Sequence, residues 1–147
     1  MGQLEIPPHS RIYIDTAIAI YSVEWNPEYF SLLQPLWLKF QTQEIELVSS
    51  ELILMETLVL PLRNKDIGLI DAYEELLLSE PMNLISVNQS ILRLAANLRA
   101  TTNLKTPNVI HAATAISVNC DLFLTNDQGF LNLANLPVVI LSEVLND

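Results

Sequence analysis

The stretch IYIDT at residues 12–16 is matched near the other end of the chain by LFLTND at residues 122–127. Each is a short apolar run followed by an aspartate, Asp15 in the first case and Asp127 in the second. Such runs, separated by helical patterns, are typical of buried strands in a parallel sheet. The carboxyl ends of these strands form the crevice where α/β proteins bind ligands. The two stretches therefore predict an α/β fold with one acidic pocket.

Short apolar strands alternate with helical stretches along the rest of the sequence. We expect a single domain over residues 1–147 with a parallel sheet of about five strands, because the chain has no long linker and no internal repeat. The expected strands are residues 11–14, 46–48, 83–87, 121–124 and 138–141. The expected helices are residues 16–21, 27–40, 50–60, 64–78, 89–100 and 106–118, with Pro61 ending the third and Thr106 capping the last.

Composition and charge limit the classes of function. Half of the 147 residues are hydrophobic, and the formal net charge is -10 at pH 7. An acidic surface repels phosphate backbones, so we expect nucleic-acid binding only where it is local and assisted by a metal ion. Charged residues interrupt every apolar run before it reaches the length of a membrane span, so we expect a cytoplasmic protein. Cys120 is the single cysteine and is expected to be a buried thiol.

A third acid, Glu56, interrupts the apolar helix expected over residues 50–60. Taken alone, Asp15 also suits a helix N-cap and Glu56 a solvent-facing position. Carboxylates that gather without basic partners repel one another, and a divalent cation removes that repulsion. Oxygen ligands without a Cys or His cluster favour Mg²⁺ or Mn²⁺ over Zn²⁺.

Several segments resemble, in the right order, the motifs of PIN-domain ribonucleases. They are IDT at 14–16, the helix with Glu56, TPNVIHAATA at 106–115 and DLFLTND at 121–127. The resemblance covers nearly the whole chain and is greatest to the small bacterial VapC toxins of toxin–antitoxin pairs. It implies a three-layer α/β/α domain with a parallel sheet and an acidic Mg²⁺ or Mn²⁺ site that cleaves RNA. It also assigns Asp15, Glu56 and Asp127 to the family's acids, and Thr16, Thr125 and Asn126 to the supporting polar residues.

Asn108 departs from the family's pattern, which has an aspartate at this place. It joins the predicted catalytic and metal-binding set with a carbonyl oxygen in place of a carboxylate, so we expect weaker metal binding. Two hypotheses stay open, a metal-dependent endoribonuclease and a PIN-fold binding or regulatory protein with little or no turnover. His111, one turn further on, is more typical of a buried structural histidine than of a ligand, and His9 is expected to be exposed.

The resemblance also implies partners. One is the RNA substrate, and another is a small antitoxin protein whose C-terminal segment blocks the acidic pocket. Apolar helix stripes that contain Trp37 or Leu76–Leu78 predict in addition that the chain forms a homodimer.

Other chemistries of strand ends fit less well. A dinucleotide or phosphate loop needs a glycine-rich turn after a strand, but the three glycines are scattered at positions 2, 68 and 129. A phosphatase of the haloacid-dehalogenase type would carry a second aspartate at the position of Ala17. A phosphoacceptor receiver domain would need an acid pair after the first strand and a lysine after the last strand, and both are missing from the sequence.

Overall fold

A five-stranded parallel sheet forms the centre of the computed structural model, which describes residues 2–147. The strand order is β3-β2-β1-β4-β5, and each neighbouring pair is parallel. The strands are β1 (Arg11–Ile14), β2 (Glu46–Ser50), β3 (Asn83–Ile85), β4 (Leu122–Thr125) and β5 (Val138–Ile140). The predicted α/β class and the predicted parallel sheet are therefore confirmed.

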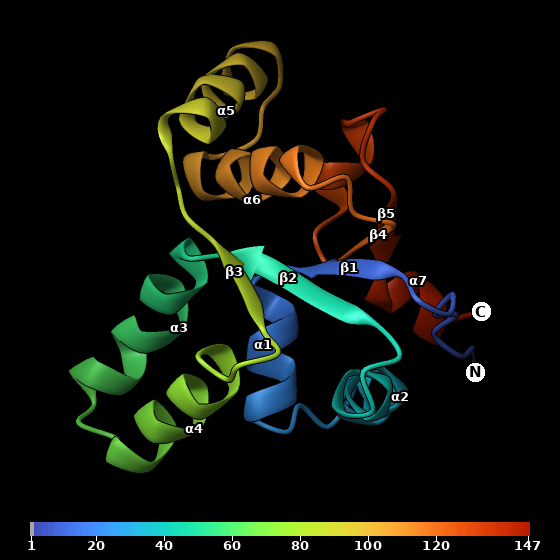
Figure 1. Cartoon of the computed structure of the whole chain (residues 1–147), viewed down its shortest axis with the longest axis vertical. Helices are drawn as coiled ribbons and strands as arrows, with labels where there is room; N and C mark the ends of the chain where they lie inside the picture. Colours follow the sequence, from blue (N-terminus) through green and yellow to red (C-terminus); the bar gives the residue numbers. More distant parts are fainter. Residues whose placement is uncertain (1) are drawn as a thin grey trace.

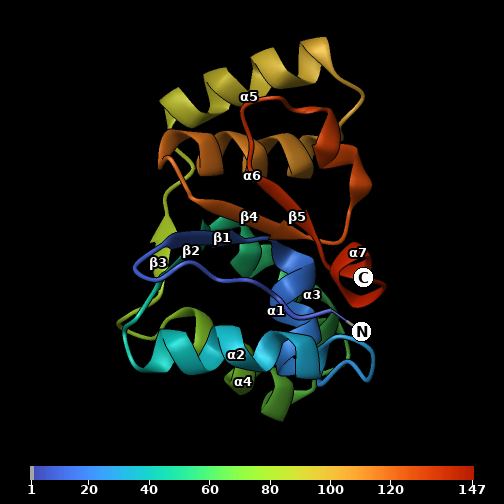
Figure 2. The ribbon, with the colours of Figure 1, turned by 90° about the vertical axis from the view of Figure 1, so that its right-hand side faces the viewer.

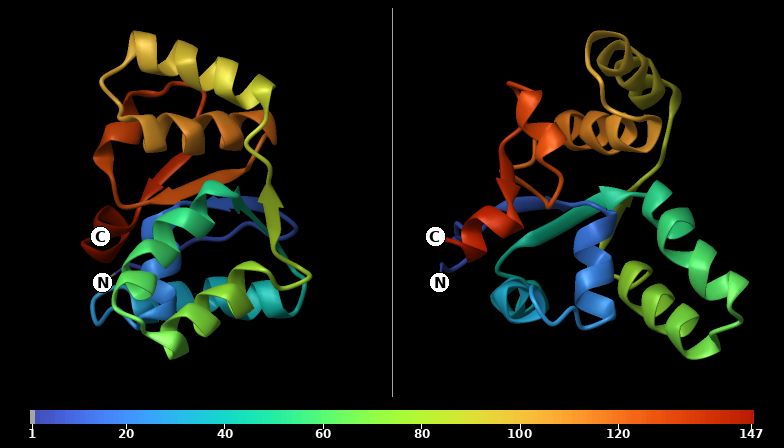
Figure 3. Two further views of the ribbon diagram at one scale, coloured as in Figure 1. Left: turned by 90° about the vertical axis from the view of Figure 1, so that its left-hand side faces the viewer. Right: turned by 180° about the vertical axis from the view of Figure 1, so that it is seen from behind.

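Helices cover both faces of this sheet, which gives the three layers seen in Figure 1. One face carries α1 (Thr16–Val23), α2 (Phe30–Gln41), α3 (Leu52–Arg63) and α4 (Ile67–Leu77). The opposite face carries α5 (Gln89–Thr101) and α6 (Thr106–Ser117), as the turned views in Figures 2 and 3 show. A short 3₁₀ helix, η1 (Gln128–Asn132), joins β4 to β5, and α7 (Leu141–Leu145) follows β5.

The chain connections create a topological switch point between β1 and β4. From β1 the chain proceeds outward through β2 to β3. It then crosses the face of the sheet covered by α5 and α6 and returns to β4, which lies beside β1 on the side opposite β2. Ligands of open α/β sheets bind beyond the carboxyl ends of the strands at such a point. Asp15 directly follows β1 and Asp127 lies two residues after β4, so both predicted acids lie there.

The alternation of side chains along the strands separates two apolar cores. Ile12, Ile14 and Leu124 pack with residues of α1 and α2 on one face. Tyr13 and Phe123 point to the opposite face, where their rings stack with centroids 5.0 Å apart and pack against α6. All five side chains are fully buried, at about 1.5–3 kcal/mol for each large apolar side chain. Packing on both faces therefore fixes the two strands that carry the acids.

Pro61 does not end α3, contrary to the prediction from sequence. The helix continues to Arg63, with Pro61 inside its last turn and buried against the core. Pro61 has no N–H to donate to the carbonyl of Thr57, and burial of its ring offsets the loss of this hydrogen bond.

Side-chain caps move the starts of other helices away from the predicted positions. α2 begins at Phe30 and not at residue 27, because the side chain of Asn26 accepts hydrogen bonds from two backbone N–H groups and forms a turn there. α4 begins at Ile67, after Asp66, whose carboxylate caps it. Thr106 is the first helical residue of α6 and not its cap. Other ends differ by one or two residues, the usual uncertainty of boundaries.

Two expectations about single side chains are confirmed. Cys120 is buried, and burial together with the neighbouring Asp121 raises the pKa of its thiol to about 11. His9 is exposed. Within residues 2–147, each helix is too short or too polar to cross a lipid bilayer.

Candidate active site

Asp15 is a buried acid that also begins a helix. Its Oδ1 accepts a hydrogen bond from the backbone N–H of Ile18 at 3.3 Å, and its Oδ2 accepts one from the hydroxyl of Thr125. The residue is 7% exposed, and across residues 2–147 it makes no ion pair with Lys or Arg. Burial raises the pKa of Asp15, the bond from Thr125 and the attraction to His111 oppose this, and the nearby Asp127 adds to it.

Thr125, the last residue of β4, connects the two strand-end acids. Its hydroxyl donates to Asp15 and accepts a hydrogen bond from the backbone N–H of Asp127 at 3.1 Å. The Oδ1 atom of Asp127 in turn accepts from the backbone N–H of Gly129 at 2.8 Å, at the start of η1. The structure thus brings Asp15, Thr125 and Asp127 together at the end of the sheet, with Asp15 buried and Asp127 exposed.

Asn108 joins this group from the first turn of α6. Its Nδ2 donates a hydrogen bond to Oδ2 of Asp127 at 3.0 Å. An aspartate at this position would face that carboxylate with a second negative charge, so the amide replaces repulsion by attraction. The amide oxygen of Asn108 has no hydrogen-bond partner among the described residues. That oxygen is the atom with which Asn108 would coordinate a hard cation.

Glu56 lies on α3 and points to different partners. Its Oε1 accepts hydrogen bonds from the hydroxyl of Thr16 and from Nε2 of His111, each at 2.7 Å. Partial burial acts to raise the pKa of Glu56, but the bonds from His111 and Thr16, together with attraction to His111, outweigh it and lower the pKa. Glu56 is therefore held inward as an ionised acid and does not face solvent freely.

His111 lies behind Glu56 and is almost completely buried, with 3% of its side chain exposed. Its Nδ1 is bonded to the hydroxyl of Tyr13 at 2.6 Å, and the two rings meet edge to face. Burial raises the pKa of Tyr13 well above its usual value, so that hydroxyl stays protonated. The expected buried histidine is confirmed. The contribution of Tyr13 was not predicted, because a tyrosine within an apolar strand is typical of a core residue.

The four predicted site residues therefore fall into two adjacent groups. Asp15, Asp127 and Asn108 form one, and Glu56 belongs to the other with Thr16 and His111. In the part of the chain that the structure describes, no three His, Cys, Asp or Glu side chains converge closely enough to hold a metal ion alone. Two carboxylates with an amide oxygen still suit Mg²⁺, which commonly binds through one or two carboxylates and keeps several waters. The donor chemistry of the first group fits such an ion.

Asn126, a predicted supporting residue, bonds to neither group of site residues. Its Nδ2 donates to the hydroxyl of Tyr21 at 3.2 Å, and its Oδ1 accepts from the backbone N–H of Ser142 at 2.9 Å. These bonds connect α1, the end of β4 and α7. Asn126 therefore stabilises the packing of elements around the site and does not contact the acids.

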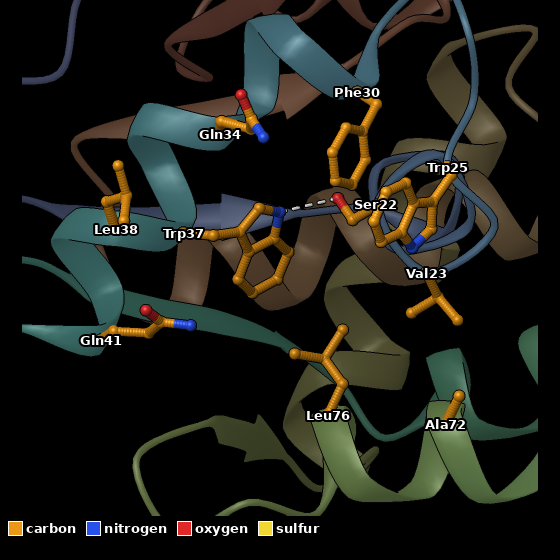
Figure 4. Close-up of a pocket in the computed structure, with 10 residues that line it drawn as sticks. All are labelled: Ser22, Val23, Trp25, Phe30, Gln34, Trp37, Leu38, Gln41, Ala72 and Leu76. Atoms are coloured by element: carbon orange, nitrogen blue, oxygen red, sulfur yellow. Dashed lines mark hydrogen bonds between the residues drawn. The ribbon is translucent and has the colours of Figure 1, made fainter.

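An apolar groove of about 500 Å³ lies between α1, α2 and α4, away from the acids (Figure 4). Trp25 is 71% exposed and stacks on Phe30 with ring centroids 4.5 Å apart, while the indole N–H of Trp37 donates to Ser22 at 2.8 Å. The stripes predicted for dimerisation divide here, since Trp37 and Leu76 line the groove while Leu77 is buried in the core. The groove is lined by Ser22, Val23, Trp25, Phe30, Gln34, Trp37, Leu38, Gln41, Ala72 and Leu76.

Several solved structures of toxin–antitoxin complexes contain chains with this fold. VapBC2 from Rickettsia felis, bound to a DNA fragment from its promoter, matches with a TM-score of 0.69 and 18% identity, over 88% of this chain and 98% of that chain. A toxin–antitoxin complex from Klebsiella pneumoniae matches with a TM-score of 0.64 and 21% identity, over 87% and 95% of the two chains. VapBC-1 from nontypeable Haemophilus influenzae gives 0.60 and 21%, over 90% and 98%.

Comparison with curated protein sequences gave no match. The model of the PIN domain family, however, matches residues 12–136. That range contains nearly all of β1 and the whole of β2, β3 and β4. It also contains both groups of site residues and the switch point between β1 and β4. The chain belongs to the PIN domain family.

Proposed function

We propose that this chain is a metal-dependent endoribonuclease that hydrolyses RNA phosphodiester bonds with Mg²⁺ or Mn²⁺. The observation that carries the proposal is the acid pair at the switch point. Asp15 is buried without a Lys or Arg partner in the described structure, and Asp127 lies close enough to raise its pKa further. Such an arrangement is costly unless a cation offsets the charge. The net charge of -10 also repels RNA where no cation intervenes.

The side chains have distinct parts in this proposal. Asp15, Asp127 and the amide oxygen of Asn108 would hold the ion, and Glu56 would add its carboxylate from α3. When bound, the ion supplies positive charge that offsets the charge of the RNA phosphate and of the departing oxygen. Thr125 links the carboxylate of Asp15 to the backbone of Asp127, because its hydroxyl donates to the first and accepts from the second. Thr16 and His111 keep Glu56 ionised and oriented.

We propose further that the nuclease is the toxin of a toxin–antitoxin pair and acts on RNA in the cytoplasm. Membership of the PIN domain family supports a nuclease, and the likeness in fold to chains of toxin–antitoxin complexes supports this role. Uncontrolled cleavage of RNA would harm the cell that makes the protein. A protein inhibitor is therefore a necessary part of the proposal.

We assign the apolar groove to this inhibitor as its docking surface, in addition to the acidic pocket that its C-terminal segment would block. Its lining has no charged side chain, but Glu75 lies in its continuation between α2 and α4. An amphipathic segment with a basic residue would cover the apolar residues and pair with Glu75. Co-expression with the product of the neighbouring gene tests this. Leu38→Asp should weaken the complex, whereas the exposed Leu131→Asp on η1 should leave it unchanged, and equal affinities would refute the assignment.

The proposed homodimer has a better candidate surface than the predicted stripes. Met55, Val59 and Leu62 follow helical spacing along α3 and are 60%, 44% and 58% exposed. A second copy would remove this apolar stripe from water. The molar mass from light scattering should be that of a dimer for the native chain and that of a monomer for Val59→Lys. A native monomer would refute the proposal.

A specific observation also favours the second hypothesis, a PIN-fold regulator with little turnover. Asn108 neutralises the place next to Asp127 through its own hydrogen bond, so the acid pair is less negative than in a site with a third carboxylate there. Weaker attraction for a cation would reduce or abolish cleavage.

One experiment separates the two functions. The native chain, Asp15→Asn and Asn108→Asp are incubated with a panel of labelled RNAs in Mg²⁺, in Mn²⁺ and in chelator. Asp71→Asn is the matched control, because Asp71 is exposed on α4 and makes no hydrogen bond or ion pair with other described residues. Cleavage by the native chain and the control, but not by Asp15→Asn or in chelator, supports the nuclease. Cleavage by Asn108→Asp alone supports the regulator, and cleavage that survives chelator or Asp15→Asn refutes a metal-dependent site.

A further inference from the structure

His111 is buried where four elements meet. The side chain extends from α6 and contacts Tyr13 of β1, Thr16 of α1 and Glu56 of α3. Both ring nitrogens are used, since Nδ1 bonds to Tyr13 and Nε2 bonds to Glu56 and lies 3.2 Å from the hydroxyl of Thr16. A ring with both nitrogens committed to different elements has one orientation, and neither nitrogen is free to contact a substrate.

The chemistry of the partners decides where the proton lies on this ring. A carboxylate only accepts hydrogen bonds, so Nε2 of His111 carries the proton that it shares with Glu56. In the neutral ring Nδ1 is then an acceptor, and the hydroxyl of Tyr13 donates to it. Glu56 therefore selects the tautomer in which Nε2 carries the proton, and Tyr13 holds the ring at its other nitrogen.

Both hydrogen bonds that Glu56 accepts end on the same oxygen. Thr16 and His111 donate to Oε1, whereas Oε2 has no hydrogen-bond partner anywhere in residues 2–147. The side chain is 24% exposed, so Oε2 is accessible. A glutamate has three flexible torsions, so an unrestrained carboxylate would turn freely into solvent. The bonds to Oε1 prevent that movement and leave Oε2 available.

We propose that His111 is a positioning residue that fixes Glu56 through Oε1, so that Oε2 stays available to the site, and that Tyr13 holds the ring of His111 in place at Nδ1. The inference rests on the proposed nuclease function and assigns to His111 no contact with substrate. Partners that orient a functional carboxylate or ligand in this way commonly contribute about 10- to 100-fold to activity or metal affinity.

The first test measures the ring directly and needs no activity. The chain contains two histidines, His9 and His111, so long-range ¹H–¹⁵N spectra of protein labelled at histidine nitrogen contain two sets of signals. We expect a proton on Nε2 of His111 and a mixture of tautomers for the exposed His9. Tyr13→Phe should shift the Nδ1 signal of His111, because that nitrogen loses its partner, while the proton stays on Nε2. An Nε2 without a proton in the native chain would overturn the inference.

The second test separates positioning from packing by a graded series. His111→Gln places an N–H donor near the former Nε2 and preserves the bond to Glu56, His111→Asn imitates only the Nδ1 side, and His111→Leu preserves neither. We expect His111→Leu and His111→Asn to lose about 10- to 100-fold in kcat for RNA and in Mn²⁺ affinity by calorimetry, with KM little changed. His111→Gln should retain most of both, and His9→Gln is the matched control.

Equal losses in His111→Gln and His111→Leu, with native circular dichroism spectra, would overturn the inference. A fall in kcat with a proportionate rise in KM would also do so, because it would indicate general disruption of the site. If the native chain neither cleaves RNA nor binds Mn²⁺, the proposed function fails. The tautomer of His111 then still decides whether the ring holds Glu56.

Discussion

Asn108→Asp is the substitution for which the structure gives the clearest magnitude. The Nδ2 atom of Asn108 lies 3.0 Å from Oδ2 of Asp127, and the new carboxylate would take that place. At this distance of 3.0 Å, two unit charges repel by about 1.4 kcal/mol in water-like surroundings. That limit applies because Asp127 is exposed. The lost hydrogen bond adds about 0.5–1.5 kcal/mol, so the variant should be destabilised by roughly 2–3 kcal/mol in chelator.

Thermal unfolding in chelator and in Mn²⁺ measures this effect. For a chain of this size the penalty corresponds to a decrease in Tm of roughly 5–10 °C. Mn²⁺ should raise the Tm of Asn108→Asp more than that of the native chain, because three carboxylates attract the cation more strongly than two. Saturation at about 100 times Kd would restore about 2.7 kcal/mol. Asn135→Asp, which adds the same charge in an exposed loop, is the matched control.

The pH dependence provides an independent check on the cause. The penalty is present at neutral pH, where both carboxylates are charged, and disappears on acidification, because protonation of either one removes the repulsion. A variant as stable as the native chain in chelator at neutral pH, with no larger gain from Mn²⁺, would refute the reasoning.

Three further substitutions test the buried network and the buried acid. Tyr13→Phe leaves Nδ1 of His111 without its donor and should lower the free energy of unfolding in urea by about 1–3 kcal/mol. The control Tyr29→Phe should stay within about 0.5 kcal/mol of the native chain, because the hydroxyl of Tyr29 makes no hydrogen bond within the described residues. Equal losses would contradict the bond between Tyr13 and His111. Burial raises the pKa of Asp15, so Asp15→Asn should be more stable than the native chain at neutral pH, and this difference should vanish as the pH falls through the raised pKa. Lower stability of the variant at neutral pH would argue against a buried charge at Asp15. Glu56→Gln should lower the urea midpoint at neutral pH and make that midpoint less dependent on acidification, because the lowered pKa of Glu56 stabilises the native fold at neutral pH and this contribution is lost as the carboxylate is protonated. An unchanged dependence of the midpoint on acid pH would contradict this prediction.

The sequence was sufficient to predict the meeting of Asp15 and Asp127, and the reason is geometric. Parallel strands end at one edge of a sheet, so two acids that each follow an apolar strand arrive at the same edge wherever the strands are adjacent. Adjacency of β1 and β4 is the one additional fact that the structure supplies. The position of Asn108 followed from the resemblance to PIN-domain ribonucleases. Its hydrogen bond to Asp127 depends on how α6 meets η1 and is not encoded locally.

The contacts of Glu56 and His111 could not be predicted from sequence. They lie on α3 and α6, helices that belong to opposite layers and meet only beyond the end of the sheet. The spacing of apolar residues along either helix gives no information about that meeting. The place of Trp25 in the apolar groove was also not predicted, for another reason. Its backbone is left-handed, with φ of 54°, and a tryptophan gives no sequence signal for that conformation.

The hydroxyl of Thr125 attaches the carboxylate of Asp15 to the sheet and not to a loop. Thr125 ends β4, a central strand held by hydrogen bonds on both sides, and the acid of β1 is bonded directly to it. A cation that binds Asp15 therefore orders no segment of chain at this acid. Because the entropic cost of ordering, roughly 1–2 kcal/mol per residue, is absent there, the contribution of Asp15 to cation affinity depends mainly on charge and hydration.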